Sequence, residues 1–215
     1  LLFREDRVER LRGLVGPGRV VGVVGPSGVG KTSLTIKALR GLRVDCSVKR
    51  DYASIIRELA RQAGVNARSI PAVMEGLLSL EPHIVVLDDF TLARRTRRLV
   101  GLVEKLSERH AVVLVAHPSI KPELTGITDV TIEMPPYSDK ELYEILEDRV
   151  IRGALPVSEE AIHAVSERIG YPKGSGSARL AIISLKKALE ICTSHRDPEV
   201  TERHVQVAFR LLSLY

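Results

Sequence analysis

The sequence lacks tryptophan altogether and has only two cysteines among its 215 residues. Cys46 and Cys192 belong to no CxxC motif and no Cys/His cluster, so we expect neither a disulfide framework nor a thiolate metal site. The six histidines show no H-x-x-x-H spacing, which argues against a zinc site. Two ordinary thiols favour a cytoplasmic protein.

Long apolar runs are also missing, since none approaches the roughly 18 residues that a membrane-spanning helix needs. We therefore expect no membrane partner. Aromatic residues make up only 4% of the chain, and this scarcity argues against base stacking as the main contact with single-stranded nucleic acid. The net charge of +5 is compatible with an anionic partner without requiring one.

What is present indicates a folded α/β protein, because 44% hydrophobic and 27% charged residues exclude a disordered chain. Apolar runs typical of buried strands lie at 19–24, 43–47, 84–87, 111–116 and 129–132. Between them, helical patterns cover 31–42, 51–63, 69–80 and 92–109, the last with Leu92, Leu99 and Val103 facing inward. Strands separated by helices predict a parallel sheet with helices on both faces.

The pattern changes at Pro135-Pro136, after which no strand-like run occurs. Four helices are predicted there, at 138–151, 158–169, 176–194 and 201–212, and Ser138 with Glu141 forms a capping box that opens the first. We therefore predict a nucleotide-binding α/β base over residues 1–134, followed by a small all-helical lid over residues 135–215.

The strongest chemical signal is GPSGVGKT at residues 25–32, which matches the phosphate-binding pattern G-x-x-x-x-G-K-[ST]. Glycines let the backbone wrap so that its N–H groups point at phosphate oxygens, and the following helix presents its N-terminus to the anion. Lys31 would reach the β- and γ-phosphates of ATP, and Thr32 would ligate Mg²⁺. The predicted contacts to ATP or ADP are Gly25, Pro26, Ser27, Gly28, Val29, Gly30, Lys31, Thr32 and Ser33. The alternative is a glycine-rich turn before a helix.

A second signal is the apolar strand at 84–87, which ends in Asp88 and Asp89. Asp88 would hold Mg²⁺ through water at the carboxyl end of the sheet. Asp89 occupies the position where many ATPases of this layout carry a glutamate that orients the attacking water. Because aspartate is one methylene shorter, either the water shifts or hydrolysis is slow. An acidic turn after a strand is the alternative for the pair.

Other segments resemble the AAA+ initiator ATPases of archaeal DNA replication, which are related to the eukaryotic origin recognition complex. The similarity extends over residues 2–214. Arg4-Glu5 resembles the start of the family's first helix, and the more specific matches are MPPYS at 134–138 and GSARLA at 176–181. The resemblance implies a P-loop AAA+ base with a five-stranded parallel sheet and a helical lid.

The same resemblance assigns two sensors. Arg179 would reach the γ-phosphate from the lid and couple the nucleotide state to the lid angle. His117, which follows the fourth predicted strand, occupies the first sensor position, where the family usually has asparagine. The alternatives are a solvated arginine and a histidine that is hydrogen-bonded to the backbone at the strand end.

Two features depart from the family pattern. Residues 111–148 contain no arginine, so the arginine finger that family members direct at a neighbour's ATP has no counterpart there. Family members also continue into a winged-helix DNA-binding domain, whereas Tyr215 lies just after the lid; either such a domain is missing from this sequence or the protein is a short paralogue.

The densest basic segment, Arg94-Arg95-Thr96-Arg97-Arg98, could neutralise DNA phosphates, although a basic helix face is more often simply solvated. Lys49-Arg50 with Arg57 and Arg61 is a weaker candidate. The resemblance thus implies a slow ATPase that acts as a nucleotide switch in replication initiation, cytoplasmic and associated with the nucleoid. Its partners would be double-stranded DNA and other AAA+ initiator subunits or the replicative helicase. Two alternatives stay open: a non-hydrolysing protein stabilised by ATP, and a remodeller or clamp-loader-like ATPase without DNA contact.

Overall fold

The computed structural model describes residues 2–93 and 97–213. Contacts between residues divide the chain into two compact units. The first comprises Phe3–Gly25 and Lys31–Met134, and the second comprises Leu2, Pro26–Gly30 and the residues from Pro135 onward. The loop before Lys31 therefore makes most of its contacts with the second unit, although the helix that it precedes belongs to the first.

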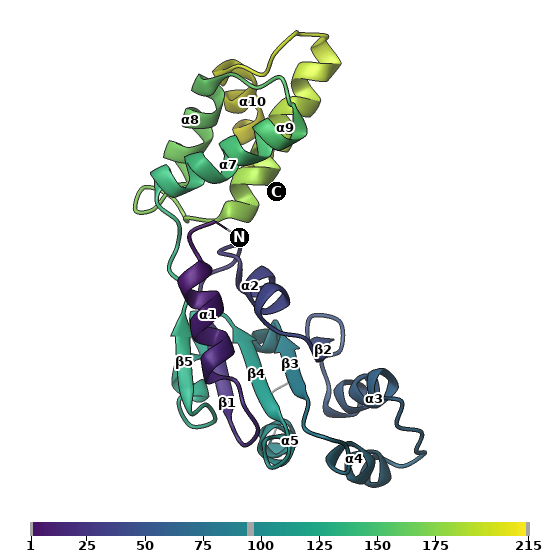
Figure 1. The fold of residues 1–215 in the computed structure, drawn as a ribbon. Helices are drawn as coiled ribbons and strands as arrows, with labels where there is room; N and C mark the ends of the chain where they lie inside the picture. The colour runs from purple at the N-terminus through teal and green to yellow at the C-terminus, as the bar shows by residue number, and fades with distance from the viewer. Residues whose placement is uncertain (1, 94–96, 214–215) are drawn as a thin grey trace. The chain divides into compact units, whose positions relative to one another are not determined.

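The first unit is built on a five-stranded sheet (Figure 1). Its strands are β1 (Val20–Val24), β2 (Leu42–Asp45), β3 (Ile84–Asp88), β4 (Ala111–Ala116) and β5 (Val130–Glu133), in the spatial order β2-β3-β4-β1-β5. Every pairing is parallel. The predicted five-stranded parallel sheet is confirmed, and its central strands are buried along their length, as a sheet covered on both faces requires.

Helices connect these strands. They are α1 (Glu5–Leu14), α2 (Lys31–Ala38), α3 (Tyr52–Ala63), α4 (Ile70–Leu78), α5 (Arg97–Ser107) and the short α6 (Lys121–Leu124), with 3₁₀ turns η1 (Phe90–Leu92) and η2 (Pro118–Ile120). Local signals define two of the starts: Asp51 caps α3 by accepting from the Ser54 N–H, and Ser69 caps α4 by accepting from the Ala72 N–H.

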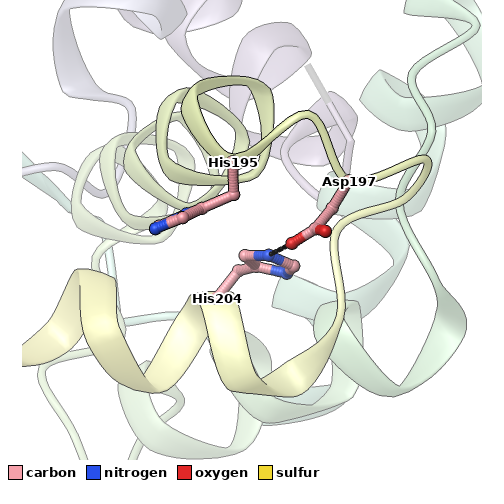
Figure 2. Close-up of side chains that lie close together, drawn as sticks. All are labelled: His195, Asp197 and His204. Atoms are coloured by element: carbon pink, nitrogen blue, oxygen red, sulfur yellow. Dashed lines mark hydrogen bonds and ion pairs between the residues drawn. The ribbon is translucent and has the colours of Figure 1, made fainter.

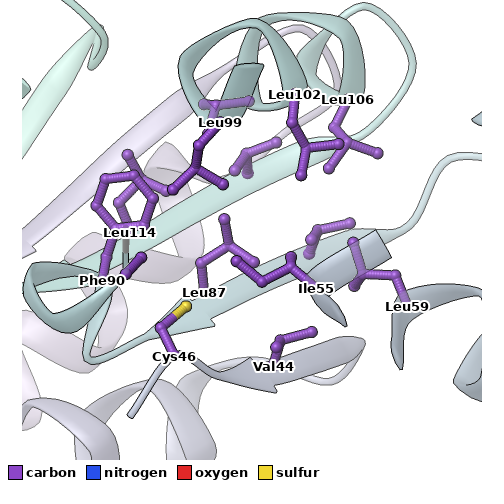
Figure 3. Close-up of a cluster of buried hydrophobic side chains, with 14 of the residues drawn as sticks. Val44, Cys46, Ile55, Leu59, Leu87, Phe90, Leu99, Leu102, Leu106 and Leu114 are labelled. Atoms are coloured by element: carbon purple, nitrogen blue, oxygen red, sulfur yellow. The ribbon is translucent and has the colours of Figure 1, made fainter. Parts of the chain in front are cut away.

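One continuous hydrophobic cluster joins α3, α4 and α5 to one face of the sheet. Figure 3 shows its centre, formed by Val44, Cys46, Ile55, Leu59, Leu87, Phe90, Leu99, Leu102, Leu106 and Leu114. The alternate strand residues, among them Val23 and Val113, are buried as well and face the opposite side, where α1 and α2 cover the sheet. Both faces are therefore packed, which holds the carboxyl ends of the strands in one row.

The second unit consists mainly of helices and also includes the loop at Pro26–Gly30. It contains α7 (Asp139–Gly153), α8 (Glu159–Ile169), α9 (Ala178–His195) and α10 (Glu202–Leu212). The predicted capping box of α7 is present: the Ser138 hydroxyl accepts from the Glu141 N–H, and the Glu141 carboxylate accepts from the Ser138 N–H.

Two helix predictions were wrong at their ends. The helix expected to run to residue 42 ends at Ala38, because Leu42 already pairs with Val85 as the first residue of β2. The helix expected from Leu92 does not include that residue, because Leu92 lies in the 3₁₀ turn η1 that follows the left-handed Asp89; the described part of the helix is α5. The Leu92 side chain is consequently 49% exposed instead of facing inward. Among the described residues, no helix is long and apolar enough to cross a membrane.

The packing of the first unit predicts a large cost for shortening Leu87, a β3 residue with no exposed surface. Leu87→Ala should lower the free energy of unfolding by about 2–5 kcal/mol, because it removes buried methyl groups and leaves a cavity. Urea denaturation followed by circular dichroism measures this change. Leu92→Ala is the matched control in the same unit, and an equal loss in both variants would contradict the assigned core.

Candidate nucleotide-binding site

The glycine-rich loop adopts a backbone that only glycine accommodates easily. Gly28 and Gly30 have φ values of 79° and 92°. A methyl group built on Gly28 would lie 2.0 Å from the Ser177 hydroxyl and 3.0 Å from the β-carbon of Arg179. The glycine at position 28 therefore lets the loop pack closely against the start of α9, and both positive φ values agree with a glycine-rich phosphate-binding motif.

The loop leads into α2, whose first two residues are Lys31 and Thr32. The Lys31 ammonium donates to the carbonyl of Gly25 at 2.8 Å, so the side chain folds back over the loop that precedes it. Gly25 is itself held at the sheet, because its N–H donates to the carbonyl of Ala116 at the end of β4. The cation and the start of the loop thus meet at the carboxyl edge of the sheet, where α/β proteins bind their ligands.

Asp88 ends β3 at this same edge, and the structure brings it to Thr32. The Thr32 hydroxyl donates to Oδ1 of Asp88 at 3.2 Å, and the Asp89 N–H donates to the same oxygen at 3.1 Å. A hydroxyl and a carboxylate oxygen are hard ligands of the kind that Mg²⁺ prefers. This donor pair, with the N-terminus of α2 that carries Thr32, therefore fits a magnesium ion bound to phosphate.

Oδ2 of Asp88 has a partner that the sequence analysis missed. Arg43 of β2 donates to it from Nη1 at 2.9 Å, and its other terminal nitrogen donates to the Thr35 hydroxyl at 3.0 Å. Burial raises the pKa of Asp88, while the Arg43 charge and the Thr32 hydroxyl act in the opposite direction. A charged residue in the middle of a strand of a doubly covered sheet was the available signal for this pair.

Asp89 contributes its N–H to the buried network of Asp88, but its side chain lies outside that network. Its backbone is left-handed, with φ 48° and ψ 39°, and its side chain is exposed. A left-handed backbone is uncommon for residues other than glycine, and such conformations concentrate at functional sites. The turn aims the short Asp89 side chain away from the sheet core and toward solvent.

His117 follows β4, the neighbour of β3 in the sheet. The Ser119 N–H donates to its Nδ1 at 3.2 Å, so that nitrogen is an acceptor and the ring proton of the neutral form lies on Nε2. The His117 N–H donates to the Thr91 hydroxyl at 2.7 Å, which ties the end of β4 to the turn after β3. The exposed ring therefore offers one N–H donor, as an asparagine amide would.

Arg179 lies in the first turn of α9, after the helix cap Ser177. Its N–H donates to the carbonyl of Gly28 at 3.3 Å, so within the second unit the start of α9 contacts the glycine-rich loop directly. The predicted sensor residue and the predicted phosphate loop are thus joined by backbone contact.

The predicted DNA-contacting segment is described only in part. Arg97 and Arg98 begin α5 with exposed side chains, whereas Arg94, Arg95 and Thr96 lie outside the described residues. In the weaker basic candidate, Arg61 is paired with Glu58 at 2.6 Å, which reduces the positive charge that it offers.

A cluster that sequence spacing did not indicate lies in the helical unit, where one ring nitrogen each of His195 and His204 and an Asp197 carboxylate oxygen lie within 4.8 Å of one another (Figure 2). The hydrogen bonds of His204 show that it forms the cap of α10 together with Thr201. The Thr201 N–H donates to Nδ1 of His204 at 3.0 Å, which places the ring proton on Nε2, and that nitrogen contacts Asp197 at 2.8 Å. A metal bound to Nε2 would displace this proton. Because Nδ1 accepts a hydrogen bond and carries no proton either, the ring would then be fully deprotonated, so the geometry does not favour a metal.

No protein-family model matches the chain. A DNA replication protein from Sulfurisphaera tokodaii, described as ORC1-type protein 2, is 31% identical over 240 residues, covering 88% of this chain and 56% of that protein. Its counterpart from Saccharolobus solfataricus is 28% identical, with the same coverage. The chain thus spans just over half the length of these two relatives.

Solved structures share the fold. Cdc6p from Pyrobaculum aerophilum aligns with a TM-score of 0.77 and 23% identity over 93% of this chain and 64% of that one. The ORC1 protein of Aeropyrum pernix, solved in complex with DNA, aligns with a TM-score of 0.81 and 20% identity over 99% of this chain and 66% of that one. The chain belongs to the archaeal ORC/Cdc6 family of AAA+ initiators. The predicted family and the AAA+ fold are therefore confirmed.

The histidine cap of this AAA+ chain generates a prediction. His204→Ala should lower the free energy of unfolding by about 0.5–2 kcal/mol, because α10 loses its reciprocal cap. His204→Gln should retain most of the stability, because the glutamine amide can both accept from Thr201 and donate to Asp197. Thermal unfolding with and without one equivalent of Zn²⁺ measures both effects. A large zinc-dependent stabilisation that His204→Ala abolishes would contradict the cap assignment.

Proposed function

We propose that this chain is the nucleotide-binding module of a replication initiator, which binds ATP with Mg²⁺, hydrolyses it slowly and acts as a switch. The observation that carries the proposal is the pair formed by Thr32 and Asp88, 3.2 Å apart beside a loop with two positive-φ glycines. Such a pair is how phosphate-loop proteins hold the metal of a nucleoside triphosphate. The curated relatives named as DNA replication proteins supply the biological setting.

The proposed roles follow the chemistry of each group. Loop N–H groups and the Lys31 ammonium bind the phosphates, and Thr32 and Asp88 hold the metal. Mg²⁺, when bound, neutralises charge on the β- and γ-phosphates. The Nε2–H of His117 donates to a phosphate or to water, and Arg179, which is fixed to the loop through Gly28, senses the γ-phosphate.

Slow hydrolysis is proposed from two features of the chain. Asp89 directly follows Asp88 in the sequence, and its side chain is exposed. This side chain is shorter than that of a glutamate by one methylene. Residues 111–148 also supply no arginine that could act on a neighbour's nucleotide. Where present, such an arginine contributes roughly 10³–10⁵ in rate.

Double-stranded DNA is the proposed macromolecular partner, with other initiator subunits or the replicative helicase as further ones. The support is the exposed pair Arg97 and Arg98 on α5 and the likeness to an ORC1 protein whose structure was solved with DNA. Arginine pairs of this kind neutralise backbone phosphates without reading sequence.

A second candidate is an ATP-stabilised interaction protein that does not hydrolyse its nucleotide. The exposed, left-handed Asp89 favours it, because this side chain faces solvent and is one methylene shorter than the glutamate that many ATPases of this layout use. Single-turnover hydrolysis separates the two: tight binding without turnover over hours selects the non-hydrolysing form.

The nucleotide site predicts that Lys31→Ala weakens ATP binding by roughly 10- to 150-fold, the equivalent of about 1.5–3 kcal/mol for a lost charge-assisted hydrogen bond. Titration calorimetry with ATP and Mg²⁺ measures the affinity. Lys37→Ala is the matched control, since Lys37 lies on the same helix and pairs with Glu5 at the surface. Unchanged affinity in Lys31→Ala would exclude the loop as the phosphate site.

The DNA proposal predicts salt-dependent binding to duplex DNA that differs between ATP and ADP. Replacing both Arg97 and Arg98 by glutamate should reduce the steepness of log affinity against log salt by about 2, because each lost phosphate contact accounts for about 0.9 of the slope. The charge-matched control replaces Arg12 and Arg152, which pair with Glu9 and Asp148. Equal losses in both double variants would show that only net charge matters.

A further inference from the structure

Arg43 lies in β2, opposite Val86 of β3, and its side chain runs toward the carboxyl edge of the sheet, where Asp88 ends β3. Its side chain is 27% exposed, whereas the Asp88 side chain is only 8% exposed. The charge of a nearly buried carboxylate is therefore balanced by a partner that comes from the adjacent strand. Burying that carboxylate alone would be strongly unfavourable.

The two oxygens of Asp88 have different partners. Oδ1 accepts from the Thr32 hydroxyl and the Asp89 N–H, while Oδ2 accepts from Nη1 of Arg43 at 2.9 Å. Contacts at both oxygens define the plane of the carboxylate. Oδ1 is thereby directed toward Thr32, the other proposed metal ligand.

Arg43 also reaches Thr32 by a second route. Its Nη2 donates to the Thr35 hydroxyl at 3.0 Å, and that hydroxyl donates to the Thr32 carbonyl, also at 3.0 Å. Arg43, Asp88, Thr32 and Thr35 thus form a closed ring of hydrogen bonds that links β2, β3 and α2. The planar fork of arginine makes the two contacts from two separate nitrogens held in a fixed geometry, whereas lysine has a single nitrogen on a flexible stem.

We propose that Arg43 is a positioning residue for magnesium, which fixes the Asp88 carboxylate with Oδ1 facing Thr32 and so sets the affinity of the nucleotide site for the metal. The inference rests on the proposed function as an ATP–Mg²⁺ module. The two contacts of Arg43 leave Oδ1 and the Thr32 hydroxyl on the same side of the carboxylate. Arg43 therefore assists the metal and does not compete with it.

The test measures binding of a fluorescent ATP analogue as Mg²⁺ is titrated from an EDTA-buffered start. Arg43→Met keeps the length of the side chain and removes both contacts. It should raise the Mg²⁺ concentration for half-maximal effect roughly tenfold, as expected for a lost charge-assisted contact, and leave the affinity in EDTA within about twofold. The Mg²⁺ requirement of Arg43→Lys should fall between those of the wild type and Arg43→Met, because lysine keeps the charge but not the planar fork.

A double-mutant cycle with Asp88→Asn shows whether Arg43 acts through the carboxylate. In the Asp88→Asn background, Arg43→Met should change the Mg²⁺ dependence by less than about twofold. Arg152→Met is the control, because it removes another arginine–aspartate pair, with Asp148 on α7. Should Arg43→Met fail to fold, as thermal unfolding without ligand will show, Arg43→Lys carries the same cycle.

The outcomes separate the two proposals. A wild-type chain that binds the analogue equally with and without Mg²⁺ overturns the proposed function, and the role of Arg43 with it. A normal wild-type response with an unchanged or lower Mg²⁺ requirement in Arg43→Met overturns the role of Arg43 alone. A higher requirement that is equally large in the Asp88→Asn background also overturns it, because Arg43 would then act independently of Asp88.

Discussion

The balance of charge at the buried Asp88 carboxylate is the constraint on which the site depends. A carboxylate with 8% exposure needs compensating donors, and three elements supply them: Thr32 from α2, Arg43 from β2 and the N–H of Asp89 from the turn after β3. The same contacts orient the group. Local stability and the proposed metal-binding geometry therefore depend on one network, and removing any donor should affect both.

The parallel sheet makes this network possible. In the order β2-β3-β4-β1-β5, the loop after β1, the turn after β3 and His117 after β4 all leave the same edge. Packing on both faces holds these strand ends in place. Within the second unit, the glycine-rich loop contacts the start of α9 through the carbonyl of Gly28.

Much of the fold could be predicted because its signals are local. The cap at Ser138 and the strand before Asp88 each depend on a few consecutive residues, and both are found where the sequence places them. The prediction of a helix from Leu92 was wrong because the chain makes a left-handed turn at Asp89, at the end of β3, and continues into a 3₁₀ turn. That turn has no clear local signal in the sequence. The role of Arg43 was not predicted because its partner, Asp88, is distant in sequence. The role of His204 was not predicted because its capping contact depends on which ring nitrogen carries the proton. The roles of the nucleotide-contacting residues stay predictions.

The most direct test is a crystal structure of the chain with a non-hydrolysable ATP analogue and Mg²⁺. The account predicts the triphosphate on the 25–32 loop, the metal between the Thr32 hydroxyl and Oδ1 of Asp88, and Arg43 still bonded to Oδ2. A metal on the Oδ2 side with Arg43 displaced, or a triphosphate bound away from the loop, would contradict it.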